Sequence, residues 1–169
     1  MTATSTHTAA PRLPPAPITF RRATDADRVH VEALQAAAYA RNRALLGVEP
    51  APLVADYSHV FATMEIWLAE ERDRLRGVLI LELEPDAVHI WSLAAAPDAQ
   101  KQGLGPILLD AAEIRAAQLG RDRIRLCTGA KLSSLVAWYQ RHGYAIERTE
   151  VLHDRTITHM AKPVPPHHD

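Results

Sequence analysis

The residues best suited to chemistry lie in segment 97–106, Pro-Asp-Ala-Gln-Lys-Gln-Gly-Leu-Gly-Pro, between a strand-like and a helix-like stretch. Gly103 and Gly105 let the backbone turn tightly and come close to a ligand. The first amides of a helix have no partner within the helix and lie at the positive end of its dipole. The segment therefore predicts an anion site suited to a pyrophosphate, to which Lys101 adds a positive charge.

Two widespread phosphate-binding loops do not fit this segment. A Walker loop is excluded because no Gly-Lys-Ser/Thr follows the glycines. A Rossmann fingerprint is excluded because Leu108 occupies the third glycine position. The alternative that stays open is a plain connection between a strand and a helix.

The loop also resembles a known motif. Gln100-x-x-Gly103-x-Gly105 is similar to the Gln/Arg-x-x-Gly-x-Gly/Ala motif of GNAT acetyltransferases, and residues 93–97 resemble the strand end and proline that precede it. The resemblance covers roughly residues 18–162 and implies a GNAT-like fold with acetyl-CoA as co-substrate. It implies that loop amides hold the CoA pyrophosphate and that the preceding strand pairs with the pantetheine arm. The cofactor-binding residues so implied are Leu93, Ala94, Ala95, Gln100, Lys101, Gln102, Gly103, Leu104 and Gly105. Pro106 departs from the pattern by lacking one N–H donor, although proline is tolerated in the first turn of a helix.

A second segment, residues 137–144, resembles the aromatic-Tyr-x-x-x-Gly-Phe/Tyr stretch of the same family. A CoA thiolate that leaves a thioester needs a proton or a strong hydrogen bond. The resemblance assigns this role to Tyr139, whereas ordinary aromatic packing is the alternative. Many relatives carry an asparagine earlier in this helix, where the chain has Leu132 and Leu135. Ser133 and Ser134 are the candidate substitutes, and Ser134 is the one predicted to hold the CoA arm.

The general base is less clearly marked. An amine is protonated at neutral pH and must lose a proton before it attacks. Many GNAT relatives place a carboxylate on the strand before the loop, but residues 88–93 contain none. His89 has a suitable intrinsic pKa and shares a strand face with Trp91. The competing interpretation is a half-exposed strand residue near Asp86, and Glu82 and Glu84 are weaker candidates.

Residues 39–57 are expected to form one wall of the acceptor site. Residues 50–57 resemble a segment of one subgroup of uncharacterised GNAT proteins, which favours a small-molecule or amino-acid-like acceptor. Asp56 either holds a cationic acceptor, caps a helix or lies on a solvated face. The predicted acceptor residues are Tyr39, Asp56, Tyr57 and Trp91.

The elements that must position these residues follow from hydrophobic periodicity. Strands are predicted at 18–22, 64–69, 77–83, 88–95, 124–127, 144–151 and 156–161, and helices from Thr24 or Asp25 to Ala38, at 53–61, 103–119 and 133–141. Residues 41–52 are expected to be irregular. The resulting fold class is α/β (α+β mixed), with a mostly antiparallel mixed sheet of six or seven strands and helices on both faces. Acetyl-CoA is expected to lie where the strands at 88–95 and 124–127 splay apart.

The Thr-, Ala- and Pro-rich residues 1–17 predict a disordered tail, 18–162 one folded domain and 163–169 a second flexible tail. Cys127, the single cysteine, is expected to be a buried structural thiol. A net charge of −1 argues against nucleic acid and membrane partners. Without a signal peptide or a spanning segment, we expect a cytoplasmic protein. The nine histidines form no tight ligand motif, so we expect no catalytic metal.

The sequence therefore predicts an N-acetyltransferase that moves an acetyl group from acetyl-CoA to a primary amine in a ternary complex. Homodimers are common in the family that it resembles. Two alternatives stay open: an acetyl-CoA-binding sensor with little catalysis, and a protein N-terminal or lysine acetyltransferase. A generic nucleotide-binding domain fits less well, because its glycine loop would follow the first strand.

Overall fold

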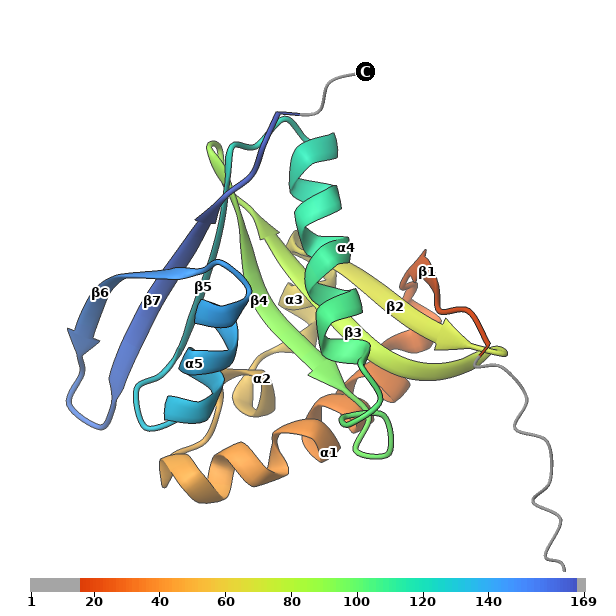
Figure 1. Ribbon diagram of the computed structural model, residues 1–169. Helices are drawn as coiled ribbons and strands as arrows, with labels where there is room; N and C mark the ends of the chain where they lie inside the picture. The colour runs from red at the N-terminus through yellow and green to blue at the C-terminus, as the bar shows by residue number, and fades with distance from the viewer. Residues whose placement is uncertain (1–15, 167–169) are drawn as a thin grey trace, which may run out of the picture.

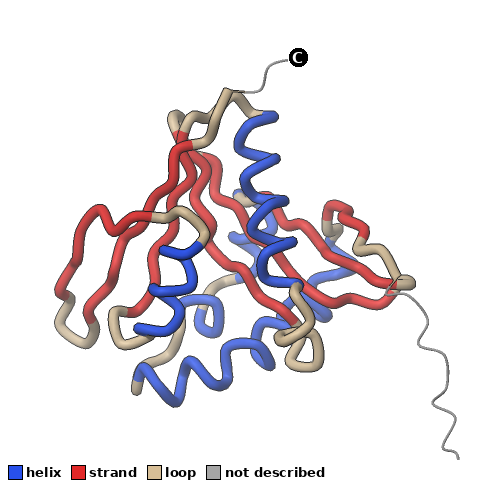
Figure 2. The backbone as a smooth tube through the Cα atoms, in the orientation of Figure 1, coloured by secondary structure: helices blue, strands red, loops and turns tan. Residues whose placement is uncertain are grey.

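A seven-stranded sheet forms the centre of the computed structural model, which describes residues 16–166 (Figure 1, Figure 2). Its strands are β1 (Thr19–Arg22), β2 (Glu65–Glu71), β3 (Arg74–Leu83), β4 (Ala87–Ala95), β5 (Arg123–Gly129), β6 (Ala145–Val151) and β7 (Thr156–Pro163). They lie in the order β1-β2-β3-β4-β5-β7-β6, and only β4 and β5 are parallel. The predicted mostly antiparallel mixed sheet is confirmed.

Helices cover both faces of this sheet, as predicted (Figure 1). They are α1 (Arg28–Leu46), α2 (Ala51–Val54), α3 (Tyr57–Thr63), α4 (Leu104–Gln118) and α5 (Ser133–Arg141), with a 3₁₀ turn at Asp25–Asp27 before α1. Residues of α1 and α3 pack in one apolar cluster, and residues of α4 and α5 pack in another on the opposite face. Because β4 and β5 are parallel, the chain must cross over between them, and α4 makes that crossover.

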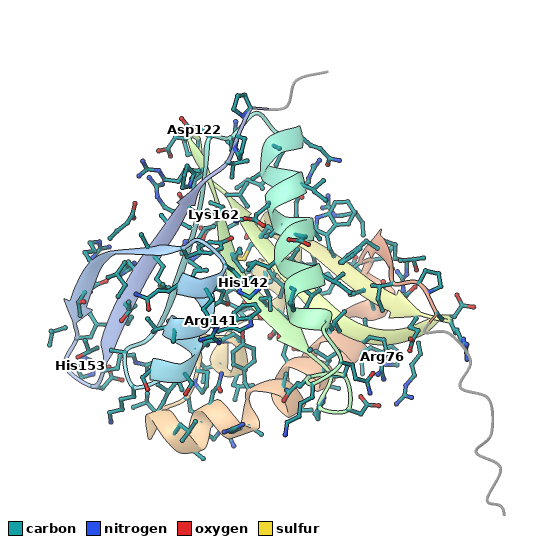
Figure 3. All side chains as sticks on the ribbon, viewed as in Figure 1. Arg76, Asp122, Arg141, His142, His153 and Lys162 are labelled. Carbon is teal, nitrogen blue, oxygen red and sulfur yellow. The ribbon has the colours of Figure 1, made fainter. Side chains whose placement is uncertain are left out.

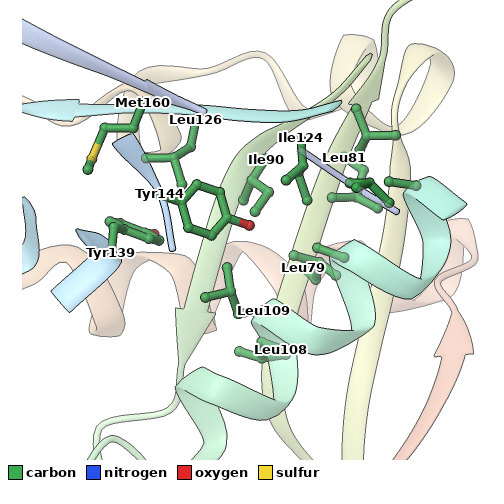
Figure 4. Packing of buried hydrophobic residues seen from close by; sticks show 14 of the residues in the cluster. Leu79, Leu81, Ile90, Leu108, Leu109, Ile124, Leu126, Tyr139, Tyr144 and Met160 are labelled. Carbon is green, nitrogen blue, oxygen red and sulfur yellow. The ribbon is translucent and has the colours of Figure 1, made fainter. Parts of the chain in front are cut away.

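The cluster under α4 and α5 is the larger of the two (Figure 4). Central strands supply Leu79, Leu81, Ile90 and Ile124, each at most 4 % exposed. Strands buried on both faces read as nearly continuous apolar runs, which is why Val78–Leu81 shows no alternation. This cluster fixes the crossover helix against the middle of the sheet.

Two helical segments differ from the sequence prediction. Helix α1 continues through residues 41–46, which were expected to be irregular, because Arg, Ala and Leu sustain a helix even without an apolar stripe. Gly47 ends it in the left-handed conformation, with φ of 68°. The single helix predicted at 53–61 is two short helices, α2 and α3, because Ala55 is extended.

Two expectations about burial also need correction. Cys127 is exposed rather than buried, because Ile124 and Leu126 are the β5 residues that point into the core. The cluster on the opposite face contains no β5 residue that could cover Cys127. Strand β7 also extends past Lys162, since Pro163 is its last residue and Val164 is 7 % exposed. The predicted tails otherwise fall largely outside the described residues.

A test of this packing uses Gly77, where side chains of α4 lie close to the backbone of β3. A Cβ at this position would lie 3.1 Å from Leu104 Cδ2, 3.2 Å from the carbonyl oxygen of Ala94 and 3.2 Å from Leu108 Cδ1. Gly77→Ala should therefore lower the free energy of unfolding by about 1–3 kcal/mol, measured by urea denaturation. Val29→Ala, at a residue that is 71 % exposed, is the control and should change it by less than about 0.5 kcal/mol. An unchanged Gly77→Ala protein would contradict this packing.

Candidate active site

Strands β4 and β5 separate part of the way along their length. Their Cα partners run from Ala87 with Arg123 to Ile90 with Leu126, and no pair follows, although β4 continues to Ala95 and β5 to Gly129. Figure 1 shows the two strands diverging between α4 and α5. The divergence leaves the C-terminal half of β4 without a partner on its β5 side. The gap lies between the same two strands that were expected to splay apart.

A β-bulge on β4 marks the point of divergence. Ile80 of β3 is opposite Ser92, whereas the next β3 residue is opposite Ile90, so Trp91 is an extra residue on β4. Trp91 and Ser92 both contact residues of the α1 and α3 side, since Trp91 belongs to that apolar cluster and Ser92 bonds to α1. A bulge bends and twists its strand locally, which turns β4 away from β5.

The predicted phosphate loop connects the end of β4 to α4. Gly103 precedes the helix with φ of 78°, a left-handed conformation that favours glycine. A Cβ on Gly105 would lie 3.2 Å from Cζ2 of Trp138, so this glycine lets α5 approach the start of α4. Pro106 lies in the first turn of α4, where its missing N–H breaks no helical hydrogen bond. The first turn of α4 and the aromatic end of α5 therefore lie next to each other.

A cluster of ion pairs and hydrogen bonds joins this loop to β3. Arg74 Nη2 and Arg76 Nη1 donate to Asp98 Oδ2 over 2.8 and 3.0 Å, and Arg76 Nη2 donates to Gln102 Oε1 over 3.2 Å (Arg76 is labelled in Figure 3). The guanidinium of Arg76 holds the pKa of Asp98 below its usual range. Arg76 is only 6 % exposed. The loop is therefore fixed before any ligand binds.

This cluster was not predicted from the sequence. The strand was predicted at 77–83, which left Arg74 and Arg76 outside it, whereas β3 begins at Arg74 and includes both. Of the implied cofactor residues, Gln100 and Gln102 bond to the neighbouring strands: Gln100 Nε2 donates to the carbonyl of Ala95 at the end of β4 over 3.3 Å, and Gln102 Oε1 accepts from Arg76 of β3. Lys101 is exposed and makes no ion pair with another described residue.

Tyr139 of α5 lies beside the gap and is 6 % exposed (Figure 4). Its ring contacts Trp138 and Tyr144 edge-on, with ring centroids 5.0 and 5.7 Å apart. Burial raises the pKa of Tyr139, and negative charge on Tyr39 or Cys127 would raise it further. Tyr139 is therefore protonated at neutral pH, as a proton donor must be.

His89 is half-buried on β4, opposite Glu82 on β3 and Arg125 on β5. Its Nδ1 lies 3.7 Å from Oε1 of Glu84. Burial lowers the pKa of His89 below 6.5, and the neighbouring carboxylates offset only part of that effect. Glu84 accepts from Arg125 Nη1 over 2.8 Å. His89 is thus neutral at pH 7, whereas Glu84 is already engaged by a cation.

The structure brings three of the four predicted acceptor residues together. Tyr57 and Trp91 meet edge-on with ring centroids 6.4 Å apart, and the hydroxyl of Tyr39 lies 3.0 Å from Ser92 Oγ, next to Trp91 in the chain. Asp56 is exposed, and its Oδ1 accepts from the Ser58 amide over 3.0 Å. It has the capping role, which was one of its three open interpretations.

Ser134, which was predicted to hold the CoA arm, is exposed in the first turn of α5, and Leu132 before it is buried.

Among residues 16–166, no three His, Cys, Asp or Glu side chains lie close enough to hold a metal ion together. Within the same range, no helix combines the length and the hydrophobicity that crossing a bilayer requires.

Comparison with known proteins finds a relative of similar sequence. The chain is 34% identical over 97 residues to the uncharacterized N-acetyltransferase YvbK of Bacillus subtilis, a match that covers 56% of this chain and 61% of that protein. The chain therefore spans less than two thirds of the length of this relative.

Solved structures of other acetyltransferases share the fold. The ribosomal-protein-S18-alanine N-acetyltransferase of Escherichia coli superposes with a TM-score of 0.74 at 16% identity, over 90% of this chain and 97% of its own. The PaiA N-acetyltransferase of Thermoplasma acidophilum, in complex with coenzyme A, superposes with a TM-score of 0.71 at 17% identity, over 87% and 99%. A GNAT family acetyltransferase of Elizabethkingia anophelis with acetyl-CoA bound gives 0.66 at 16% identity, over 86% and 97%.

The family match includes both signature segments, the glycine loop before α4 and the aromatic segment of α5. It extends over residues 31–144, more than half of the chain, and the protein therefore belongs to the acetyltransferase (GNAT) family.

Proposed function

We propose that the protein transfers an acetyl group from acetyl-CoA to a primary amine of a small molecule. The observation that carries this proposal is the divergence of β4 from β5 beside the glycine-capped start of α4, with Tyr139 next to the gap. Membership of the acetyltransferase family supports it, as do the solved relatives of the same fold that contain CoA or acetyl-CoA.

The residues present fit two parts of acetyl-CoA, the pyrophosphate and the pantetheine arm. The first amides of α4 and the ammonium of Lys101 suit the pyrophosphate. The unpaired edge of β4 at Leu93–Ala95 offers backbone groups to the amides of the pantetheine arm, in the manner of an added strand. Ser134 is available for a further hydrogen bond to that arm.

The chemistry requires two proton movements. The acceptor ammonium first gives one proton to His89, which is neutral at pH 7 because burial lowers its pKa. The free amine attacks the thioester carbonyl, the carbon–sulfur bond breaks, and Tyr139 protonates the departing thiolate. The second amine proton restores the Tyr139 phenol. The products are the amide and CoA thiol, with one proton left on His89 for release to solvent.

The wall formed by Tyr39, Tyr57 and Trp91 favours a small acceptor over an extended polypeptide, because these aromatic side chains occupy the space beside the bulge. Cytoplasmic location and homodimer formation stay predictions. Transfer to a protein amine and binding without turnover are the outcomes that the following experiments separate.

Binding is tested first, by thermal shift and calorimetric titration with acetyl-CoA. A ligand that binds only the folded state must raise its stability, so acetyl-CoA should raise Tm while NAD and ATP should not. An amine panel with detection of free thiol then measures turnover. A response to NAD or ATP alone would overturn the proposal, and acetyl-CoA binding without turnover on any small or peptide amine would favour a sensor.

Tyr139→Phe removes the proposed proton donor and keeps the ring. We expect kcat to fall by about 10²-fold, in the range of general acid catalysis, because the thiolate must then leave without a proton. The Kd for acetyl-CoA, measured by calorimetry on the same protein, should change by less than about twofold. If kcat is unchanged, Tyr139 is not the donor.

His89→Gln removes the proposed base. In the wild-type protein kcat/KM should stay high below pH 6.5 and fall only as pH drops through the lowered pKa of His89, where the imidazole becomes protonated. The variant should lose about 10²-fold in kcat/KM at pH 7 and should lack this acidic limb. Glu82→Gln removes a carboxylate opposite His89 that raises the pKa of His89, so this variant should keep the acidic limb and shift it to lower pH. An acidic limb that persists in His89→Gln would assign the base elsewhere.

A further inference from the structure

Helix α1 carries a polar side chain inside its apolar face. Gln35 is fully buried, in the same stripe as Val31 and Leu34. Burying an amide without hydrogen bonds is costly, so its partners are informative. Gln35 Nε2 donates to Ser92 Oγ over 2.8 Å, and the Ser92 hydroxyl lies 3.0 Å from Gln35 Oε1. A long amide of α1 is therefore bonded to one residue of β4.

Tyr39 lies one turn further along α1 and faces the same way, as residues four apart do. Its hydroxyl lies 3.0 Å from Ser92 Oγ. Burial raises the pKa of Tyr39, and hydrogen bonds from Ser92 and from the Leu93 backbone act in the opposite direction. The Tyr39 hydroxyl and the Gln35 amide therefore meet at the same serine of β4.

Ser92 belongs to the bulge that turns β4 away from β5. It is 2 % exposed and stands on the α1 face directly after the extra residue, Trp91. A shift of register by one residue would turn Ser92 to the opposite, apolar face, where its hydroxyl would lose these partners. The contacts with α1 are thus available only when β4 keeps its bulge.

We propose that Gln35 and Tyr39 are positioning residues that act through Ser92: they hold the β4 bulge and so set the direction of the backbone groups of Leu93–Ala95. The proposal rests on the proposed function for its catalytic consequence, because those groups are the ones offered to the pantetheine arm. Its structural part concerns β4 alone. Neither residue needs to touch the reacting atoms.

This assignment links the two sides of the reaction. Helix α1 contributes Tyr39 to the acceptor wall, and the same hydroxyl contacts the strand that is proposed to hold acetyl-CoA. Loss of one hydrogen bond on the acceptor side should therefore weaken binding on the cofactor side. A residue that served only as acceptor wall would leave acetyl-CoA binding unchanged.

The test uses three small changes in the full chain: Tyr39→Phe, Ser92→Ala and Gln35→Met. Amide hydrogen exchange of Leu93–Ala95 is measured first in the free protein, where it needs neither ligand nor turnover. We expect at least tenfold faster exchange in each variant, with exchange in β2 unchanged. The Kd for acetyl-CoA should rise at least fivefold, and kcat should fall while KM for the acceptor changes less.

A double-variant cycle checks that the residues act as one unit. Adding Tyr39→Phe to the Ser92→Ala protein should raise the exchange rate and the Kd much less than Tyr39→Phe does in the wild-type protein. The reason is that the Ser92 hydroxyl, the partner of Tyr39, is already absent. Tyr144→Phe is the matched control for β4 exchange, since it removes a buried hydroxyl on the opposite face of the sheet that has no partner among residues 16–166. If Gln35→Met fails to fold, Tyr39→Phe and Ser92→Ala still test the proposal.

The outcomes separate this proposal from the proposed function. Unchanged exchange at Leu93–Ala95 in Tyr39→Phe and Ser92→Ala overturns the positioning role, whatever the activity. Faster exchange without acetyl-CoA binding in the wild-type protein supports the positioning role and overturns the proposed function. Faster exchange with an unchanged Kd overturns the link between the bulge and the cofactor.

Discussion

The structure depends on one constraint, which is that two parallel strands at the centre of the sheet pair for only four residues. Backbone N–H and C=O groups that leave a ladder must find other partners, because burying them unpaired is costly. The bulge, the two flanking helices and the glycine loop all surround the place where β4 and β5 part. A continuous ladder would have closed the sheet and left no room for a ligand between its strands.

Close helix packing maintains this opening. Gly77 lets α4 rest on β3, and Gly105 lets the indole of Trp138 approach the start of α4. The two helices are thereby braced on one face of the sheet, while α1 bonds to Ser92 from the other. Interiors packed at crystal-like density transmit small displacements rather than absorb them. The gap is therefore supported by packing and hydrogen bonds on both faces of the sheet.

Local patterns predicted most of the fold, because they depend on local physics. The helix at Ser133–Arg141 was predicted at its observed bounds, and Gly143, with φ of 92°, follows its end in the left-handed conformation. The cofactor loop was also recognisable, since glycine spacing and a following helix are visible in one short segment. The match to the acetyltransferase family agrees with that prediction.

Contacts between distant segments were harder to predict. The burial of Gln35 was not predicted, and nothing near it in the chain pointed to Ser92, 57 residues away. Asp98 was predicted only as part of the segment 97–106, and nothing in that segment pointed to its ion pair with Arg76. Cys127 looked buried because its neighbours are apolar, yet strand alternation turns it outward. Each depended on how elements pack, which periodicity does not encode.

The exposure of Cys127 has a practical consequence. It is the only cysteine in the chain, and it follows Leu126, the last residue of β5 that pairs with β4. A thiol-reactive fluorophore would therefore attach at a single site beside the gap without any mutation. Partial burial raises the pKa of this thiol, so attachment would be faster in mildly alkaline buffer. The protein thus carries a natural position for an optical reporter of ligand entry.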